Sequence, residues 1–301
     1  MSLQTNQLRV SRGACYLNVE TYGQRHRPAI VLVHGLGMQL VEWPTDLIHA
    51  LQQNFYVITM DNRDIGLSSR HGPDIDLKAG QASISQTNYR PPYSLFDMRD
   101  DIIAVVNHLQ IRRFACVGFS MGGMLAQLVA AYAPERVLAL VQIGSTGSEA
   151  DLGSSKECQQ RLQRITQSNN CQTELVQMMV EDFAYYARPM HLDAKATLEE
   201  SQLLIARGYT QGGYTRQWQA LQSLGNRLAI LQQIQAPTLI IAGVEDPCID
   251  PSHSLNAHSI ITNSELLMLP NVGHWLSEAI CQAAINWLTQ KLSGWADEPA
   301  P

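Results

Sequence analysis

Residues 114–122, Phe-Ala-Cys-Val-Gly-Phe-Ser-Met-Gly, join a short apolar run to a serine flanked by glycines, and they decide the predicted fold. The run 114–117 is typical of a buried strand, and the residues after Ser120 place apolar side chains at helical spacing. Ser120 is therefore expected where a strand turns sharply into a helix, the context that separates a nucleophile elbow from a chance G-x-S-x-G match. Gly118 and Gly122 fit this turn, because strand and helix must approach closely around it.

The serine at the predicted turn also has a chemical use. Its hydroxyl would stand exposed, and the N-terminus of the following helix would favour negative charge that develops beside it. The alternative is a glycine-rich helix start on an ordinary α/β unit, because the five-residue pattern alone is a weak signal. The strand before Ser120 and the helix after it favour the nucleophile.

Apolar runs alternate with helical patterns along the rest of the chain. Strands are expected at 7–11, 14–22, 29–33, 55–60, 113–118, 137–143, 237–243 and 264–269. Helices are expected at 42–53, 94–109, 121–133, 253–261 and 277–292. The runs 29–33 and 237–242 are almost continuously apolar, as in strands that helices cover on both faces. The pattern predicts an α/β fold with a mostly parallel eight-stranded sheet flanked by helices.

Two segments interrupt this alternation. Residues 69–92 are polar and rich in glycine and proline, so we expect a long loop there. Residues 146–233, after the sixth predicted strand, contain helical patterns and no convincing strand. We interpret them as a helical cap, or lid, because ligands bind at the carboxyl ends of such strands; the alternative is that they only extend the core. The predicted organisation is a core domain, residues 1–145 and 234–301, with a cap subdomain at 146–233.

A serine nucleophile needs a base, and the base needs an orienting acid. His274 follows the last predicted strand and precedes the last helix, so it is expected at the same edge of the sheet as Ser120. The other eight histidines are worse placed. Asp246 ends the strand before that and is the predicted acid, with Asp250 and Glu245 as rivals.

The oxyanion of an acyl-transfer reaction needs fixed hydrogen-bond donors. Met121 offers its backbone N–H beside the nucleophile. The second donor is expected from the sequence His-Gly-Leu-Gly at 34–37, where Leu36 is the preferred residue and Gly37 the alternative. A plain glycine-rich turn would also account for this stretch.

Composition excludes several classes of protein. The chain has 301 residues, 45% of them hydrophobic, and a formal net charge of -6, with no basic run to neutralise phosphates, so nucleic acid is not an expected partner. The six cysteines match no zinc spacing, and Cys116 is expected to be buried and unreactive. No metal or organic cofactor is expected. The polar first residues and the lack of a long apolar run predict a cytoplasmic protein without a membrane helix.

These motifs together resemble the α/β-hydrolase fold superfamily, in its serine-nucleophile branch. The likeness covers about residues 7–292 and rests on four motifs in order: the 34–37 loop, the elbow, the acid loop and the histidine loop. Residues 61–68, Asp-Asn-Arg-Asp-Ile-Gly-Leu-Ser, match a loop that usually has glycine where Asp64 stands. Together with Pro-Pro-Tyr at 91–93 and Tyr-Thr-Arg-Gln at 214–217, this variant resembles the aclacinomycin methylesterase-like carboxylesterases.

The resemblance implies hydrolysis of a carboxylic ester of a small or medium-sized molecule. It assigns Ser120 as nucleophile, His274 as base and Asp246 as acid, with Leu36 and Met121 forming the oxyanion hole. Arg63 and Asp64 are interpreted as structural residues that hold their loop near the site. In the cap, aromatic residues such as Tyr185, Tyr186 and Trp218 suggest an apolar pocket, unless they pack against the core.

Other activities use the same residue types. C–C bond hydrolases, cofactor-free haloperoxidases, lyases and acyltransferases of this fold share similar triads, and the cap decides between them. A non-catalytic ligand-binding relative is a further alternative, because such relatives can keep the whole triad. The sequence leaves open whether the protein is a monomer or a homodimer.

Overall fold

The computed structural model describes residues 5–13, 15–72, 92–148, 154–167 and 171–294. Its centre is an eight-stranded sheet in the order β1-β2-β4-β3-β5-β6-β7-β8. The strands are β1 (Thr5–Arg12), β2 (Cys15–Tyr22), β3 (Ala29–Val33), β4 (Tyr56–Met60), β5 (Phe114–Phe119), β6 (Val137–Ile143), β7 (Thr238–Gly243) and β8 (Ser264–Leu269). Only the β1–β2 and β2–β4 pairs are antiparallel, so the predicted mostly parallel sheet is confirmed.

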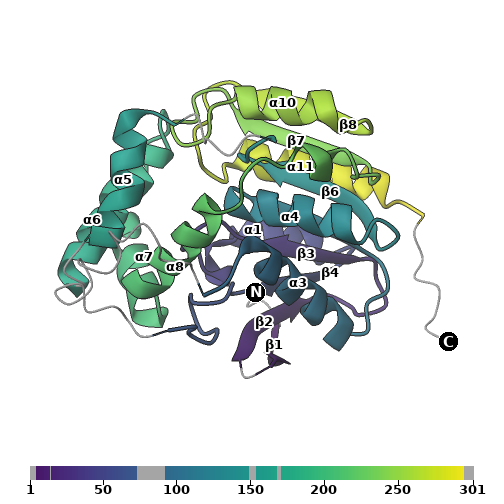
Figure 1. The fold of residues 1–301 in the computed structure, drawn as a ribbon, viewed down its shortest axis with the longest axis horizontal. Helices are drawn as coiled ribbons and strands as arrows, with labels where there is room; N and C mark the ends of the chain where they lie inside the picture. Colours follow the sequence, from purple (N-terminus) through teal and green to yellow (C-terminus); the bar gives the residue numbers. More distant parts are fainter. Residues whose placement is uncertain (1–4, 14, 73–91, 149–153, 168–170, 295–301) are drawn as a thin grey trace.

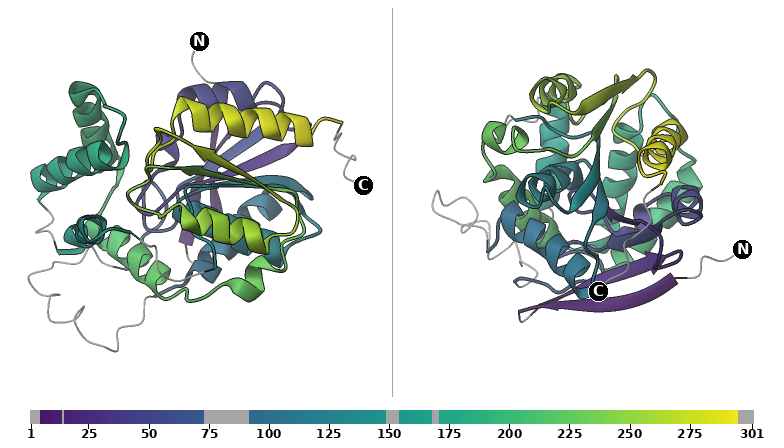
Figure 2. Two further views of the ribbon diagram at one scale, coloured as in Figure 1. Left: turned by 90° about the horizontal axis from the view of Figure 1, so that it is seen from above. Right: turned by 90° about the vertical axis from the view of Figure 1, so that its right-hand side faces the viewer.

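Helices cover both faces of this sheet. The core helices are α1 (Thr45–Leu51), α3 (Leu95–His108), α4 (Met121–Tyr132), α9 (Leu228–Leu231), α10 (Ser252–Ile260) and α11 (Glu278–Lys291). Figure 2 shows α10 and α11 on opposite faces of the sheet. The sheet side chains alternate accordingly: Val31 and Val33 pack with α3 and α4, whereas Ile30 and Leu32 pack with α1 and α11. All five residues of β3 are buried, as expected of a strand covered on both faces.

The first predicted helix is shorter than expected. The sequence pattern indicated 42–53, but the chain forms a short 3-10 turn, η1 (Leu40–Glu42), and α1 begins only at Thr45. Pro44 stands between them with φ -52° and ψ 128°, which is not a helical conformation. Proline also disfavours helical backbone at the residue before it, so the helix starts after it. The helix expected at 94–109 begins with a capping box, in which Ser94 and Asp97 exchange side-chain to backbone hydrogen bonds.

Of the five described helices between β6 and β7, α9 packs against α4 and α10 of the core, although the predicted cap, 146–233, includes it. The other four group together at one end of the sheet (Figure 1). They are α5 (Lys156–Gln167), α6 (Gln172–Tyr186), α7 (Ala194–Arg207) and α8 (Gln211–Gln222). We call α5–α8 the cap helices; the exact division of the chain into core and cap domains stays a prediction. Most of the predicted loop 69–92 lies outside the described residues. Among the described helices, none has the length and apolar character needed to cross a membrane.

Candidate active site

The predicted elbow is present between β5 and α4, and its backbone is strained. Ser120 has φ 56° and ψ -122°, a region that residues with a side chain rarely adopt. A Cβ on Gly118 would lie 2.1 Å from the Gly122 carbonyl oxygen, and a Cβ on Gly122 would lie 2.0 Å from the Val33 oxygen. Both glycines are therefore required by close backbone packing around the serine.

The structure places His274 against Asp246. His274 Nδ1 lies 2.7 Å from Asp246 Oδ2, and the two residues are buried, with 7% and 9% of their surface exposed. The other carboxylate oxygen, Oδ1, accepts backbone hydrogen bonds from Cys248 and Ile249, each at 2.8 Å. These two bonds fix the carboxylate, so that Oδ2 is directed at the imidazole.

The two rival acids have other partners. Glu245 accepts a hydrogen bond from the Val272 N–H at 3.2 Å. Asp250 accepts one from the Ser252 N–H at 2.9 Å, at the start of α10. Neither carboxylate has a hydrogen bond or ion pair to His274 in the described chain, so the geometry favours Asp246 as its acid partner.

Ser120 and His274 line the same cavity. The Phe119 ring packs on the imidazole with centroids 4.8 Å apart, and the Tyr186 carbonyl at the end of α6 accepts the His274 backbone N–H at 2.8 Å. A Cβ on Gly35 would lie 3.1 Å from the Ser120 Cβ, so the predicted oxyanion loop passes beside the serine. The histidine, the serine and this loop therefore surround one reaction volume.

The hydrogen bonds of the loop at 34–37 distinguish its two candidate oxyanion donors, Leu36 and Gly37. The Gly37 N–H already donates to Gln217 Oε1 at 2.9 Å. In the described chain, no acceptor takes up the N–H of Leu36 or of Met121, and Leu36 lines the cavity. The geometry thus favours Leu36 over Gly37 as the donor that accompanies Met121.

The cavity has a volume of about 120 Å³ and is mostly apolar. Its aromatic lining consists of Phe119, Phe183, Tyr186, Tyr209, Tyr214 and Trp275. Of the cap aromatics singled out in the sequence, Tyr186 lines the cavity, whereas Tyr185 and Trp218 pack against the core. Both of the uses considered for these side chains are therefore found. Their spacing on the helices could not separate the two, because both the core and the cavity bury the apolar face of a helix.

Two acidic side chains interrupt this apolar lining, and the sequence pattern did not single them out. Glu42 accepts a hydrogen bond from the Gln39 N–H at 2.5 Å, and burial raises its pKa to about 8. Asp182 of α6 forms ion pairs with Arg161 at 3.2 Å and Arg164 at 2.6 Å. Burial still raises the pKa of Asp182, to about 6. Glu42 is thus a cavity carboxyl without an ion pair in the described chain.

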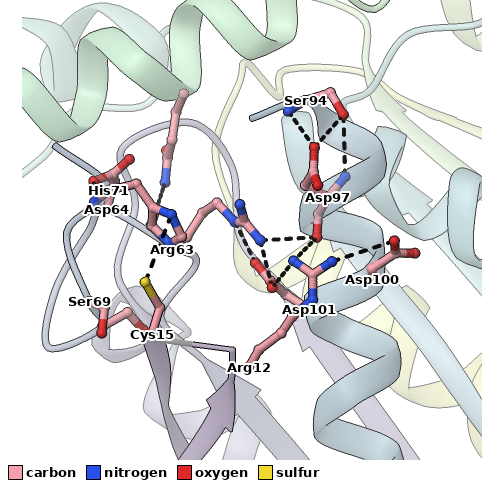
Figure 3. A network of polar contacts seen from close by, with 12 residues as sticks. Arg12, Cys15, Arg63, Asp64, Ser69, His71, Ser94, Asp97, Asp100 and Asp101 are labelled. Atoms are coloured by element: carbon pink, nitrogen blue, oxygen red, sulfur yellow. Dashed lines mark hydrogen bonds and ion pairs between the residues drawn. The ribbon is translucent and has the colours of Figure 1, made fainter. Parts of the chain in front are cut away.

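The loop at 61–68 is held by buried ion pairs, which supports the structural interpretation of its charged residues. Figure 3 shows Arg63 bound to Asp101 of α3, with Nε–Oδ2 at 2.6 Å and Nη2–Oδ1 at 2.7 Å. Asp64 binds Arg216 of α8 in the same bidentate way, at 2.9 and 2.7 Å. These pairs join the loop to the core on one side and to the cap helices on the other.

Asp64 occupies a position where glycine would be easier. Its φ is 73°, in the left-handed region that favours glycine. The Asp64 side chain nevertheless pairs with Arg216, and both are almost fully buried. Asp64 and the Tyr-Thr-Arg-Gln stretch at 214–217, two of the features on which the resemblance to the methylesterase-like branch rests, are therefore in direct contact.

The cysteines form no disulfide bond with one another, and Cys248 lines the cavity. All six are free thiols. Cys116 lies fully buried in β5, which confirms its expected burial, and burial raises its pKa to about 12, which disfavours the reactive thiolate.

Known proteins share this organisation. The chain is 29% identical over 234 residues to 3-oxoadipate enol-lactonase 2 of Acinetobacter baylyi, covering 77% of this chain and 76% of the relative. It is 25% identical over 271 residues to rhodomycin D methylesterase DauP of a Streptomyces species, covering 83% and 86%. The solved 2-hydroxy-6-oxo-6-phenylhexa-2,4-dienoate hydrolase of a Rhodococcus species superposes with a TM-score of 0.75 at 19% identity, covering 97% and 100%.

The resemblance drawn from the motifs is confirmed by these comparisons. A family model described as the alpha/beta hydrolase fold matches residues 28–278, which include the elbow and the loops of Leu36, Asp246 and His274. The match covers well over half of the chain, and a methylesterase is among the relatives. This chain is a member of the α/β-hydrolase family and a hydrolase of that fold.

Proposed function

We propose that the protein is a serine hydrolase that cleaves a carboxylic ester of a small or medium-sized molecule through an acyl-enzyme on Ser120. The observation that carries the proposal is the 2.7 Å contact between His274 Nδ1 and Asp246 Oδ2, beside a serine held in a strained elbow. A buried carboxylate bound to Nδ1 fixes the tautomer in which Nε2 can accept a proton. Nε2 is then the base for the hydroxyl of Ser120.

The reaction would proceed in two halves. Ser120 Oγ attacks the ester carbonyl while His274 Nε2 takes the hydroxyl proton. The resulting oxyanion accepts hydrogen bonds from the backbone N–H groups of Leu36 and Met121. Collapse of this intermediate breaks the bond to the alcohol, which leaves with the proton from His274. A water molecule then gives its proton to His274 and attacks the acyl carbon, and the acid is released as Ser120 regains its proton.

The cavity supports an apolar substrate of moderate size. The aromatic and aliphatic side chains around Ser120 suit an acyl or alcohol group of low polarity. Relatives named as a methylesterase and an enol-lactonase support ester or lactone opening as the type of reaction. The proposed partner is thus a small ester. A cytoplasmic location and the lack of a nucleic-acid, membrane or cofactor requirement remain part of the prediction.

The test is active-site labelling together with ester turnover. Wild type, Ser120→Ala and His274→Ala are treated with a fluorophosphonate, and the labelled residue is mapped by mass spectrometry. The three proteins are also assayed on p-nitrophenyl esters of increasing chain length. We expect a label on Ser120 that depends on His274, and turnover that both substitutions reduce by a factor on the order of 10⁴ or more. A folded wild type with neither label nor turnover would refute the proposal.

The alternatives use the same residues, and a substrate comparison separates them. A C–C bond hydrolase remains an alternative, because the phenylhexadienoate hydrolase shares this fold, at 19% identity. Such an enzyme would turn over vinylogous 1,5-diketones faster than matched esters. Haloperoxidase and acyltransferase activities are tested by supplying peroxide with halide, or a thioester acyl donor. Tight ligand binding without turnover would indicate a receptor.

A further inference from the structure

Gln217 of α8 connects the cap helices to two loops of the core. Its side chain is fully buried, and both ends of the amide are used. Oε1 accepts the Gly37 N–H at 2.9 Å, and Nε2 donates to the Arg63 carbonyl oxygen at 2.7 Å. A primary amide that donates and accepts in this way can satisfy both backbone groups, which a purely accepting or purely donating side chain cannot.

The Gly37 N–H belongs to the segment that carries the proposed oxyanion donor. Gly35 and Gly37 flank Leu36, and Gly37 has φ 72°, so this backbone is easily reoriented unless something holds it. The hydrogen bond to Gln217 fixes the plane of the peptide between Leu36 and Gly37. It also leaves the Leu36 N–H as the loop donor without an acceptor in the described chain, beside the cavity.

Gln217 is itself held in place by its helix. The neighbouring Arg216 forms the buried bidentate pair with Asp64. One turn earlier, Gly213 lies so close to the 61–68 loop that a Cβ there would be 2.1 Å from the Asp64 oxygen. The hydroxyl of Tyr214 binds the Leu162 carbonyl at 3.0 Å. The amide therefore reaches Gly37 from a fixed support, as positioning of a catalytic group requires.

We infer that Gln217 is a positioning residue for the oxyanion hole. Its side chain, on a cap helix, accepts the Gly37 N–H and so sets the orientation in which the Leu36 N–H donates to the oxyanion. The inference rests on the proposed function, because it assigns a task in acyl transfer. It makes α8 part of the catalytic apparatus and not only a cover over the substrate. Gln217 itself touches no reacting atom.

The experiment compares substitutions at two glutamines of α8, the buried Gln217 and the exposed Gln222. Gln217→Met keeps the length of the side chain and removes both hydrogen bonds. Gln217→Glu keeps nearly the same shape and the acceptor for Gly37, but it loses the donor to Arg63. Gln222→Met, at the exposed end of the same helix, is the matched control. Each protein is assayed for kcat and KM on a p-nitrophenyl ester that the wild type hydrolyses.

A positioning role predicts a split between the two kinetic constants. Gln217→Met is expected to lower kcat by about 10- to 100-fold with KM within about two-fold, because the oxyanion exists only in the transition state. Gln217→Glu should fall between Gln217→Met and the wild type, and Gln222→Met should match the wild type. Wild-type kcat in a folded Gln217→Met protein would overturn the inference. If that variant does not fold, exchange of the Gly37 amide at the rate of an unprotected amide in the folded wild type overturns the inference instead.

Hydrogen exchange separates this inference from the proposed function. Exchange at the Gly37 amide, followed by mass spectrometry on a peptide that spans 34–38, does not depend on turnover. Faster exchange in Gln217→Met than in Gln222→Met would support the hold on the loop, even if the wild type hydrolysed no ester and the proposed function failed. Unchanged exchange at Gly37 would overturn the inference, even if the wild type proved to be an active esterase.

Discussion

Ser120, the proposed nucleophile, has a strained backbone conformation at the elbow. Its φ and ψ of 56° and -122° cost on the order of 1–3 kcal/mol for a residue with a side chain. The surrounding glycines and the close approach of β3 keep it there. Free energy of folding is thus given up at the residue on which the proposed chemistry depends.

Removing the side chain at this position should reveal the strain. We expect Ser120→Gly to be more stable than Ser120→Ala by about 1 kcal/mol, because alanine keeps the Cβ that opposes this backbone and glycine does not. Chemical denaturation of the two inactive variants measures the difference. Equal free energies of unfolding, or a more stable alanine variant, would contradict a strained elbow.

The Glu42 carboxyl should make stability depend on pH. Its pKa in the folded protein is raised to about 8 from 4.5, chiefly by burial, with Glu200 and Asp61 raising it further and Arg207 opposing them. Between those values the folded protein holds a proton that the unfolded chain has lost. Stability from this group therefore falls as the pH rises from about 4.5 to about 8 and changes little above that.

Glu42→Gln isolates this contribution. The variant should unfold with a smaller loss of stability between about pH 5 and about pH 9 than the wild type, since glutamine does not titrate. Urea denaturation at several pH values gives the comparison, and Glu200→Gln tests the nearby carboxyl. Parallel pH profiles for wild type and Glu42→Gln would show that this carboxyl ionises normally.

The residues brought together at the site were predictable to different degrees. Ser120, His274 and Asp246 each follow the carboxyl end of a predicted strand, so their meeting at one sheet edge follows from the order of elements. Glu42 and Gln217 carry no such signal. Glu42 follows the loop at 34–37 in a short turn, and Gln217 is one of several glutamines on α8. What they bind depends on tertiary packing that no local pattern encodes.

At the scale of elements, the strands were the most predictable part of the molecule. β3 and β7 are short, apolar and bounded by polar turns, and they lie where the sequence placed them. The start of α1 was less predictable, because Pro44 interrupts a helical pattern that continues on both sides of it. Boundaries depend on single residues of this kind, whereas the existence of an element depends on its whole pattern.

The joint between α8 and the 61–68 loop offers a test at this scale. Asp64→Gly removes the carboxylate partner of a buried arginine, so we expect a loss of about 3–5 kcal/mol even though glycine suits φ 73°. Arg216→Met should be similarly costly because it leaves Asp64 buried without its guanidinium. The double variant Asp64→Gly/Arg216→Met should recover about 2 kcal/mol or more of the summed loss. Additive losses in this cycle would argue against a direct pair.

At the scale of the whole molecule, the cap helices are attached unevenly. Arg207 at the end of α7 pairs with Asp61 at 2.9 Å, and Gln39 donates to the Leu204 carbonyl at 2.7 Å. With Arg216 and Gln217 of α8, these contacts fix α7 and α8 to the core. α5, in contrast, exposes much of its surface; it packs against α8 and forms ion pairs with α6. This arrangement joins residues more than a hundred positions apart, so it could not be derived from the sequence.

Uneven attachment predicts uneven exchange. In hydrogen–deuterium exchange at neutral pH, peptides from α5 should exchange faster than peptides from α8, by roughly ten-fold or more, because fewer buried contacts must break to open them. A fluorophosphonate bound at Ser120 should slow exchange in α5 and α6 more than in α8. Uniform protection across the four cap helices would contradict the expected difference.

The contact between Asp64 and Arg216 also has a consequence for how the family can vary over evolution. Each residue without the other should lower the stability of the fold. Aspartate at a left-handed position is strained, and a buried arginine needs a carboxylate partner. A lineage could therefore lose or gain the two only together, or by passing through a weakened ancestor. Among homologous chains, glycine at position 64 should occur with a residue other than arginine at position 216. Positions 64 and 216 would then change together among homologous chains, as expected for two residues in direct contact.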